Sequence, residues 1–297
     1  MSDAGPGTRV TEHAPAKINL YLHVTARRTD GYHLLDSLIV FAEAGDTIEV
    51  EDAGELSLTC DGPFAAALGP PPTNLAFRAA RLLAARAGID ARARIRLTKR
   101  LPVASGIGGG SADAAAVLRA LCKLWGKRTA SVDLHDIAAA LGADIPVCLH
   151  GRPAFIGGIG ELIDPAPALP AAALLLVNPG IALATERVFK SFKGPHSAAA
   201  RFDAPPRDAA DLAELLLARR NDLTDASIAQ VPEIGTVLSA LERAPGARLA
   251  RMSGSGATCF ALFDDPETAQ AAGRELSAAY PRWWVEAAAL LSAEGQR

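Results

Sequence analysis

The most glycine-rich stretch of the sequence has the residue types of a phosphate-binding loop. Gly106-Ile107-Gly108-Gly109-Gly110-Ser111 is a backbone with almost no Cβ atoms, which can adopt positive φ and approach a ligand closely. Residues 112–124 then favour a helix that ends near Gly126. The glycines therefore precede a helix N-terminus, where unpaired N–H groups and the helix dipole favour an anion. A phosphate group is the expected ligand.

Two better-known phosphate loops do not fit this stretch. The dinucleotide fingerprint requires glycine at the position of Ser111, and a Walker A loop requires a lysine before its final serine or threonine. The remaining alternative is a flexible connector ahead of a helix. Because glycine is entropically costly to order, a run of three glycines favours a functional reason for the loop.

Two charged residues at rigid positions could act on a phosphate. Residues 18–24 alternate between apolar and polar types, which predicts a half-buried strand with Lys17 and Asn19 on one face. Asp144 lies between a helix-ending Gly142 and Pro146, in a turn that would fix one carboxylate. The plain alternatives are a solvated lysine at a strand edge and an aspartate that caps or turns the chain.

An aromatic pair follows a turn signal near the N-terminus. Tyr32 and His33 come directly after Asp30-Gly31, at the start of the apolar stretch 34–41. An exposed pair at this place would hold a planar ligand by stacking and hydrogen bonding. Ordinary packing of both rings is the alternative.

The elements around these residues follow from periodicity and capping. Helices are predicted over residues 75–87, between an Asn74 cap and Gly88, and over 133–141 and 266–279. Residues 46–51 and 56–60 predict a β-hairpin, and 91–97 a strand that leads into the glycine loop. Residues 174–177, 259–263 and 283–285 predict further strands, whereas 194–208, with three prolines, is expected to be a mobile loop.

Composition limits the class of protein. A length of 297 residues suits two domains, and a net charge of −3 argues against a general nucleic-acid binder. The four cysteines form no C-x-x-C pair, and the first nine residues lack the apolar region of a secretory signal. No apolar run is long enough to span a bilayer. We therefore expect a soluble cytoplasmic protein that binds neither nucleic acid nor membrane.

Several motifs together resemble the GHMP kinases, the superfamily named for galactokinase, homoserine kinase, mevalonate kinase and phosphomevalonate kinase. Residues 102–114 are similar to its phosphate motif, and Met-Ser-Gly-Ser-Gly-Ala at 252–257 to its C-terminal glycine motif. Ser105 and Ala112 depart from that pattern, because many relatives carry Gly and Ser there. Within the superfamily the ordered set resembles the 4-diphosphocytidyl-2-C-methyl-D-erythritol kinases. The matching motifs are Pro-Ala-Lys-Ile-Asn-Leu at 15–20, Asp-Gly-Tyr-His at 30–33, Gly-Ala-Asp-Ile-Pro at 142–146 and Asn-Asp-Leu at 221–223.

This resemblance implies an α+β chain with two domains. Residues 1–164 would form the N-terminal ATP-binding and catalytic domain, which is ribosomal-protein-S5-domain-2-like. Residues 165–297 would form the C-terminal GHMP kinase domain, a ferredoxin-like α/β sandwich. ATP is implied as co-substrate with Mg²⁺, although the sequence shows no clear carboxylate ligand for the metal. The protein is expected to be a monomer or a homodimer.

The resemblance also assigns roles to residues. Asp144 would accept or orient the proton of the substrate hydroxyl, Lys17 would stabilise negative charge beside it, and Asn19 would contact the same part of the substrate. The implied ATP contacts are Asn74, Pro102, Val103, Ala104, Ser105, Gly106, Ile107, Gly108, Gly109, Gly110, Ser111 and Ala112.

The implied acceptor is 4-diphosphocytidyl-2-C-methyl-D-erythritol, phosphorylated by ATP on its 2-hydroxyl in the non-mevalonate route to isoprenoid precursors. Tyr32 and Phe189 would flank the cytosine ring, with His33 at its hydrogen-bonding edge and Thr185 nearby. One alternative is another kinase of the superfamily, acting on homoserine or mevalonate, which would have no use for an aromatic clamp. The other is a nucleotide-sensing or RNA-associated module without catalysis, against which the intact Lys17 and Asp144 argue.

Overall fold

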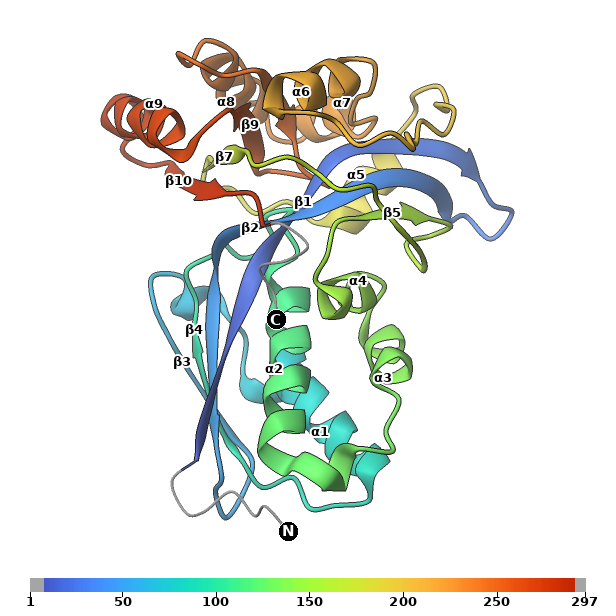
Figure 1. Cartoon of the computed structure of the whole chain (residues 1–297), viewed down its shortest axis with the longest axis vertical. Helices are drawn as coiled ribbons and strands as arrows, with labels where there is room; N and C mark the ends of the chain where they lie inside the picture. The colour runs from blue at the N-terminus through green and yellow to red at the C-terminus, as the bar shows by residue number, and fades with distance from the viewer. Residues whose placement is uncertain (1–7, 292–297) are drawn as a thin grey trace. The chain divides into compact units, whose positions relative to one another are not determined.

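The computed structural model describes residues 8–291, which form two compact units (Figure 1). Unit 1 takes its described residues from 8–16, Gly45–Val103 and Gly108–His150. Unit 2 takes them from Lys17–Ala44, Ala104–Ile107 and 151–291. Neither unit is continuous in sequence, because the long strands β1 (Arg9–Arg27) and β2 (His33–Glu51) each contribute residues to both. The domain boundary expected after residue 164 stays a prediction.

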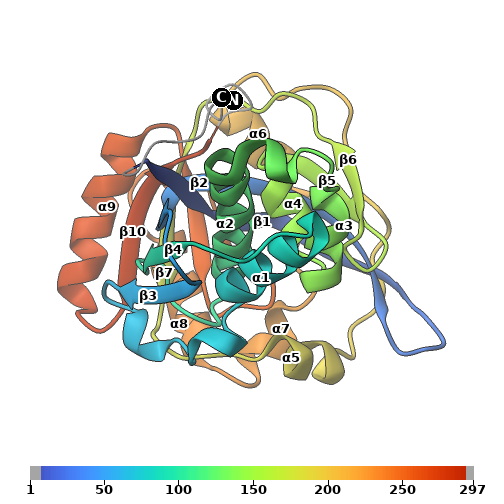
Figure 2. The same ribbon diagram turned by 90° about the horizontal axis from the view of Figure 1, so that it is seen from below.

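Unit 1 combines part of a sheet with a group of helices (Figure 2). Strand β4 (Arg94–Thr98) pairs antiparallel with the C-terminal part of β2 and parallel with β3 (Ser57–Asp61). Helix α2 (Gly109–Trp125) packs against α1 (Leu75–Ala87) and α4 (Ile145–His150), and α3 (Leu134–Leu141) packs against α1 and α4. Three short 3₁₀ turns occur at Ala65–Ala67, Pro71–Thr73 and Gly126–Thr129.

The structure contradicts the hairpin predicted from residues 46–51 and 56–60. Strand β4 lies between β2 and β3, so these two stretches do not pair with each other. Arginines on β4 reach acidic residues on both neighbours, through the pairs Arg94–Glu51 and Arg96–Asp61. Residues 46–51 of β2 alternate between buried and partly exposed as expected, whereas no residue of β3 is buried. The strand inserted between them comes later in the chain.

The helix boundaries follow the predicted caps. The Asn74 side chain accepts the N–H of Ala76 at 2.9 Å, and Gly88 ends α1 with a φ of 66°. Asp133 caps α3 by accepting the N–H of His135 at 2.8 Å. The predicted caps at Asn74 and Gly88 are confirmed, whereas Asp133, expected as the first helical residue, is the N-cap of α3. Helix α2 begins at Gly109, inside the glycine run rather than after it.

Unit 2 contains an antiparallel sheet in the order β10-β7-β9-β8. Its strands are β7 (Ala173–Asn178), β8 (Leu249–Met252), β9 (Cys259–Phe263) and β10 (Trp284–Ala289), and α8 (Glu233–Glu242) and α9 (Pro266–Ala279) pack on it. The order β7, helices, β8, β9, α9, β10 is the β-α-β-β-α-β pattern of ferredoxin-like domains. The predicted α+β class is therefore confirmed.

Unit 2 also contains part of the other sheet and three further helices. Strand β5 (Ala154–Gly157) pairs with the N-terminal part of β2 and with β6 (Leu162–Pro165), and α5 (Thr185–Ser191), α6 (Ala209–Leu217) and α7 (Thr224–Ile228) complete the unit. Residues 194–208 contain neither helix nor strand. Asp36 nevertheless accepts the N–H of Ala200 at 2.7 Å and the Nε–H of Arg201 at 3.0 Å.

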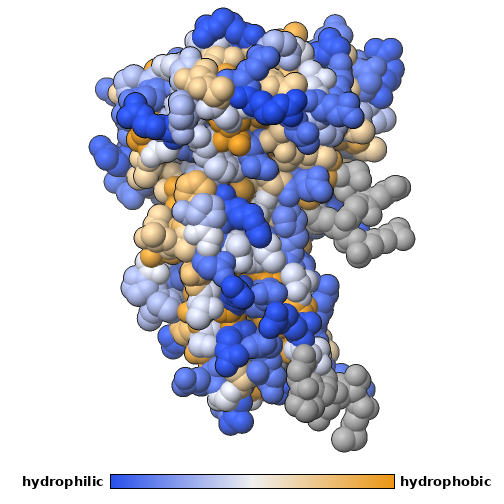
Figure 3. All heavy atoms as spheres, turned by 90° about the vertical axis from the view of Figure 1, so that its left-hand side faces the viewer, coloured by the Kyte–Doolittle hydropathy of each residue, from blue (hydrophilic) through white to orange (hydrophobic). Residues whose placement is uncertain are grey.

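Hydrophilic residues cover most of the face in Figure 3, with smaller apolar patches among them. Within residues 8–291, no helix is long and apolar enough to cross a bilayer.

Candidate active site

The centre of the glycine loop, residues 104–107, is held by backbone hydrogen bonds within unit 2. Lys17 donates its N–H to the carbonyl of Ile107 at 3.0 Å, and Thr258 donates its N–H to the carbonyl of Ser105 at 3.0 Å. The loop centre therefore bonds both to the first strand and to the turn between β8 and β9. Motifs from distant parts of the sequence meet at this loop.

Two glycine motifs interlock at this place. Gly106 has a φ of 79°, and a Cβ on it would lie 2.6 Å from the carbonyl oxygen of Gly256 and 2.7 Å from that of Ser253. A Cβ on Gly254 would in turn lie 2.7 Å from the carbonyl oxygen of Gly106. Because real Cβ atoms do not approach so closely, only glycine fits at these positions without a shift of the backbone.

A polar network extends from Lys17 to the interlocked loops. Lys17 is 4% exposed, and its Nζ donates to the Oδ1 of Asn19 at 3.2 Å. Asn19 Nδ2 donates to the Oγ of Ser37 at 2.8 Å. The Asn19 N–H donates to the Oγ of Ser253 at 3.1 Å, and that hydroxyl donates to the Gly106 carbonyl at 3.2 Å. The predicted shared face of Lys17 and Asn19 is confirmed, whereas sequence reasoning missed Ser37.

The Asn-Asp-Leu motif supports the C-terminal glycine turn. Asn221 Nδ2 donates to the carbonyls of Met252 and Gly254, each at 2.8 Å, from a buried position. Asp222 accepts the N–H of Val24 at 2.8 Å. The motif therefore holds the turn that contacts Gly106.

Aromatic rings gather around His33. Its ring centroid lies 5.4 Å from that of Phe189 and 5.8 Å from that of Phe192, the second contact being edge-on. Tyr32 beside it is 60% exposed, which is unusual for so large a ring. The structure thus places His33 beside Phe189 and leaves Tyr32 accessible. Phe192 was missed, because nothing in its local sequence distinguishes it.

The environment of His33 favours the uncharged imidazole. Partial burial, the nearby Arg27 and His196 together hold the pKa of His33 below its usual value. A neutral imidazole offers one donor and one acceptor nitrogen, which suits the edge of a base. Thr185, at the start of α5, shares a hydrogen bond of 2.8 Å with the Oγ of Ser255.

The remaining predicted residues lie in unit 1. Asp144 directly precedes α4, and its carbonyl accepts the N–H of Cys148 at 3.2 Å. Asn74 uses its side-chain oxygen to cap α1. Of the other predicted ATP contacts, Pro102, Val103 and residues 108–112 also belong to unit 1. Gly108 stands at the N-terminus of α2, so the predicted order of strand, glycine loop and helix is confirmed.

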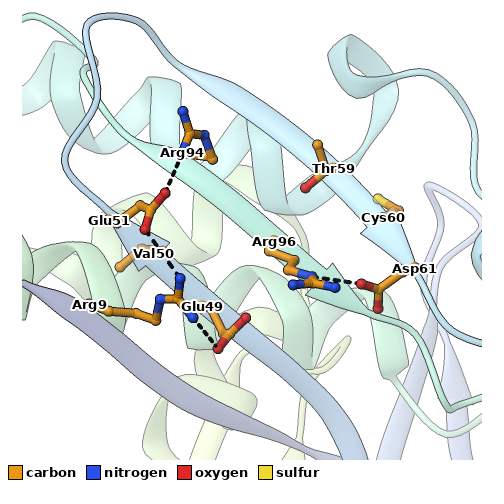
Figure 4. Close-up of a pocket in the computed structure, with 9 residues that line it drawn as sticks. All are labelled: Arg9, Glu49, Val50, Glu51, Thr59, Cys60, Asp61, Arg94 and Arg96. Atoms are coloured by element: carbon orange, nitrogen blue, oxygen red, sulfur yellow. Dashed lines mark hydrogen bonds and ion pairs between the residues drawn. The ribbon is translucent and has the colours of Figure 1, made fainter. Parts of the chain in front are cut away.

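A separate pocket of about 380 Å³ lies on the sheet of unit 1 (Figure 4). It is lined by Arg9, Glu49, Val50, Glu51, Thr59, Cys60, Asp61, Arg94 and Arg96. Arg9 pairs with Glu49 and Glu51, and the other two arginines pair with acids on neighbouring strands. This lining includes none of the predicted site residues, and its charges already satisfy one another.

The protein's own side chains form no metal cage in the part that the structure describes. No group of three or more His, Cys, Asp or Glu residues is placed there to hold an ion. This donor set fits Mg²⁺ only if the metal takes most of its ligands from phosphate oxygens and water, which is common for this ion.

Comparison with known proteins identifies the family. Family models described as "GHMP kinases N terminal domain" and "GHMP kinases C terminal" match residues 74–152 and 197–282. A 4-diphosphocytidyl-2-C-methyl-D-erythritol kinase from Paramagnetospirillum magneticum is 54% identical over 96% of this chain and 100% of its own length. The corresponding kinase of Parvibaculum lavamentivorans is 52% identical over 94% of this chain and 98% of its own.

Solved structures agree with this assignment. A crystal structure of 4-(cytidine 5'-diphospho)-2C-methyl-D-erythritol kinase has a TM-score of 0.75 and 36% identity, and covers 94% of this chain and 98% of its own. The crystal structure of homoserine kinase from Cytophaga hutchinsonii has a TM-score of 0.75 at 17% identity, and the match covers 99% of this chain and 98% of that one. At this identity the similarity shows the shared fold alone. The chain therefore belongs to the GHMP kinases, and within them to the 4-diphosphocytidyl-2-C-methyl-D-erythritol kinases.

The interlocked glycines generate a testable prediction. Gly106→Ala should lower the free energy of unfolding by about 2–4 kcal/mol, because overpacking adds to the strain of a positive φ. Gly88→Ala is the control, since Gly88 also has a positive φ but no described heavy atom lies within 4 Å of a Cβ built there. It should lose only about 1 kcal/mol. Urea unfolding measures both, and equal losses would contradict the interlock.

Proposed function

We propose that this protein transfers the γ-phosphate of ATP to the 2-hydroxyl of 4-diphosphocytidyl-2-C-methyl-D-erythritol, giving the 2-phosphate and ADP, in non-mevalonate isoprenoid precursor biosynthesis. The observation that carries this proposal is the 54% identity, over the whole length of the relative, to a kinase named for that substrate. The rings around His33 support it, because a base needs stacking partners that homoserine or mevalonate does not.

The proposed chemistry relies on position and charge rather than on a covalent intermediate. The 2-hydroxyl oxygen bonds to the γ-phosphorus, the bond from that phosphorus to its bridging oxygen breaks, and ADP leaves. Asp144 accepts or orients the hydroxyl proton, Lys17 stabilises negative charge, and Asn19 bonds to the same region of the substrate. Phosphoryl transfer gains most from such positioning and charge neutralisation.

Backbone groups are proposed to hold the phosphates of ATP. Residues 102–112 present few side chains, and their last part opens α2, where N–H groups and the helix dipole favour anions. Asn74 is proposed to contact the same nucleotide. Mg²⁺ is expected to arrive with ATP and to neutralise phosphate charge.

Broader properties complete the proposal. We infer that residues 1–164 act as the ATP-binding and catalytic domain and 165–297 as the C-terminal domain. The proposed partners are small molecules, and we expect binding to neither nucleic acid nor membrane. The protein is proposed to be a cytoplasmic monomer or homodimer.

Loss of the Asp144 carboxylate should slow turnover strongly without unfolding the protein. Asp144→Asn should lower kcat by about 10²–10⁴-fold, the usual contribution of a general base, while both KM values change little. Asp136→Asn, an exposed aspartate on α3, is the matched control and should retain the activity of the parent protein. A fully active Asp144→Asn enzyme would remove this residue from the mechanism.

The aromatic residues should govern affinity for the cytidine substrate alone. Tyr32→Ala and Phe189→Ala should each raise its KM by roughly 10-fold, because stacking on a base contributes about 1–3 kcal/mol. The KM for ATP should stay nearly constant. Tyr280→Ala serves as control, since this ring stacks on Trp283 at 3.8 Å outside the proposed site. If neither Tyr32→Ala nor Phe189→Ala changes that KM, the cytosine assignment is wrong.

A further inference from the structure

Three buried charged side chains of unit 1 form a cluster that the proposed chemistry does not use. The Nζ of Lys99 donates to the Oδ2 of Asp46 at 2.5 Å and to the Oδ2 of Asp113 at 2.7 Å. Their side chains are 2%, 0% and 4% exposed, respectively. Such complete burial of three ionisable groups is costly unless each group is well paired.

The cluster joins the two ends of the glycine loop. Lys99 directly follows β4 and precedes the loop, and Asp113 lies on α2 directly after it. The second oxygen of Asp46 accepts the N–H of Arg100 at 2.6 Å and the N–H of Leu101 at 2.9 Å. One carboxylate on β2 therefore fixes the entry to the loop, and the ammonium between the two carboxylates ties the entry to the exit.

The first residue of α2 rests on the same ammonium. A Cβ on Gly109 would lie 3.0 Å from the Nζ of Lys99 and 3.7 Å from the Oδ2 of Asp46. Glycine at this position therefore lets the N-terminus of α2 approach the buried charge. The cluster and the glycine run therefore belong to one arrangement, in which only Asp46 lies far away in the sequence.

The cluster is poorly explained as a device for stability. Among the described residues, Asp113 Oδ1 is a buried oxygen without a hydrogen-bond partner. Burial, and to a smaller extent the charge of Asp46, raise the pKa of Asp113 to about 7 against the lowering effect of Lys99. Apolar residues of similar size can often replace a buried ion cluster without loss of stability. Stability alone therefore does not explain this cluster, and its position between the two ends of the loop is the better guide to its role.

We propose that Asp46, Lys99 and Asp113 are positioning residues that clasp the two ends of the glycine loop in the geometry that binds the phosphates of ATP. The inference rests on the proposed role of this loop in ATP binding. None of the three residues needs to touch the nucleotide. Their effect is to remove alternative loop conformations before ATP binds, which raises affinity by preorganisation.

Two substitutions at Asp113 test whether its hydrogen bond to Lys99 supports ATP binding. One variant loses the acceptor oxygen and the other keeps it. Asp113→Ala removes the acceptor for Lys99 and should raise the Kd of a non-hydrolysable ATP analogue with Mg²⁺ by about 10-fold, the loss expected for one hydrogen bond to a charged group. Asp113→Asn keeps an acceptor oxygen in the same place and should stay close to the parent Kd. The Kd of the cytidine substrate, measured by calorimetry in parallel, should not change in either variant.

Arg119→Met is the matched control on the same helix. Arg119 donates to Glu12 and to the carbonyls of His13 and Cys148, away from the ends of the loop. This variant should have a lower Tm but an unchanged Kd for the ATP analogue. If Asp113→Ala does not fold, Asp113→Ser replaces it, since the shorter hydroxyl does not reach Lys99.

A folded Asp113→Ala or Asp113→Ser protein with the parent Kd would overturn the clasp. The proposal would also be overturned if Asp113→Asn and Asp113→Ala raised the Kd of the ATP analogue equally. The charge of Asp113, and not its hydrogen bond to Lys99, would then be the property that matters. If the parent protein itself does not bind the ATP analogue, the proposed function fails instead.

Discussion

The close approach of two glycine turns is the constraint on which the rest of unit 2 depends. Gly106 and the turn from Ser253 to Gly256 have backbone atoms so near each other that no side chain fits between them. This contact fixes the loop centre, and Ser253 then joins it to Asn19 and so to Lys17. Asn221 supports the same turn from behind. Residues from four distant stretches thereby share one rigid arrangement.

A rigid arrangement of this kind suits the chemistry of a small-molecule kinase. Because phosphoryl transfer needs little covalent assistance, a protein gains most by holding phosphates, hydroxyl and charge in fixed positions. Backbone N–H groups suit this task, since they present partial positive charge without the entropy cost of ordering a long side chain. In unit 1 the buried ammonium of Lys99 performs the corresponding task of fixing the loop ends.

Short-range signals in the sequence predicted the ends of the helices. Strand pairing and contacts between distant residues could not be predicted in the same way. The caps at Asn74 and Gly88 were predictable because each acts within one helix turn. The hairpin prediction failed because β4 inserts between two strands that precede it. The alternation around Lys17 revealed its face, but not Ser37, and no spacing rule brings Asp46, Lys99 and Asp113 together. Ordered motifs indicated the family, whereas the roles of Lys17 and Asp144, which lie in different units, stay predictions.

The central claim is that the acceptor carries a cytidine diphosphate group. Purified protein with ATP and Mg²⁺ should be incubated separately with 4-diphosphocytidyl-2-C-methyl-D-erythritol, homoserine and mevalonate, with ADP release as the rate and ³¹P NMR to locate the new phosphate. The account predicts turnover with the cytidine compound alone and a phosphate ester on its 2-hydroxyl. Turnover with homoserine or mevalonate, or none with any acceptor while ATP still binds, would contradict it.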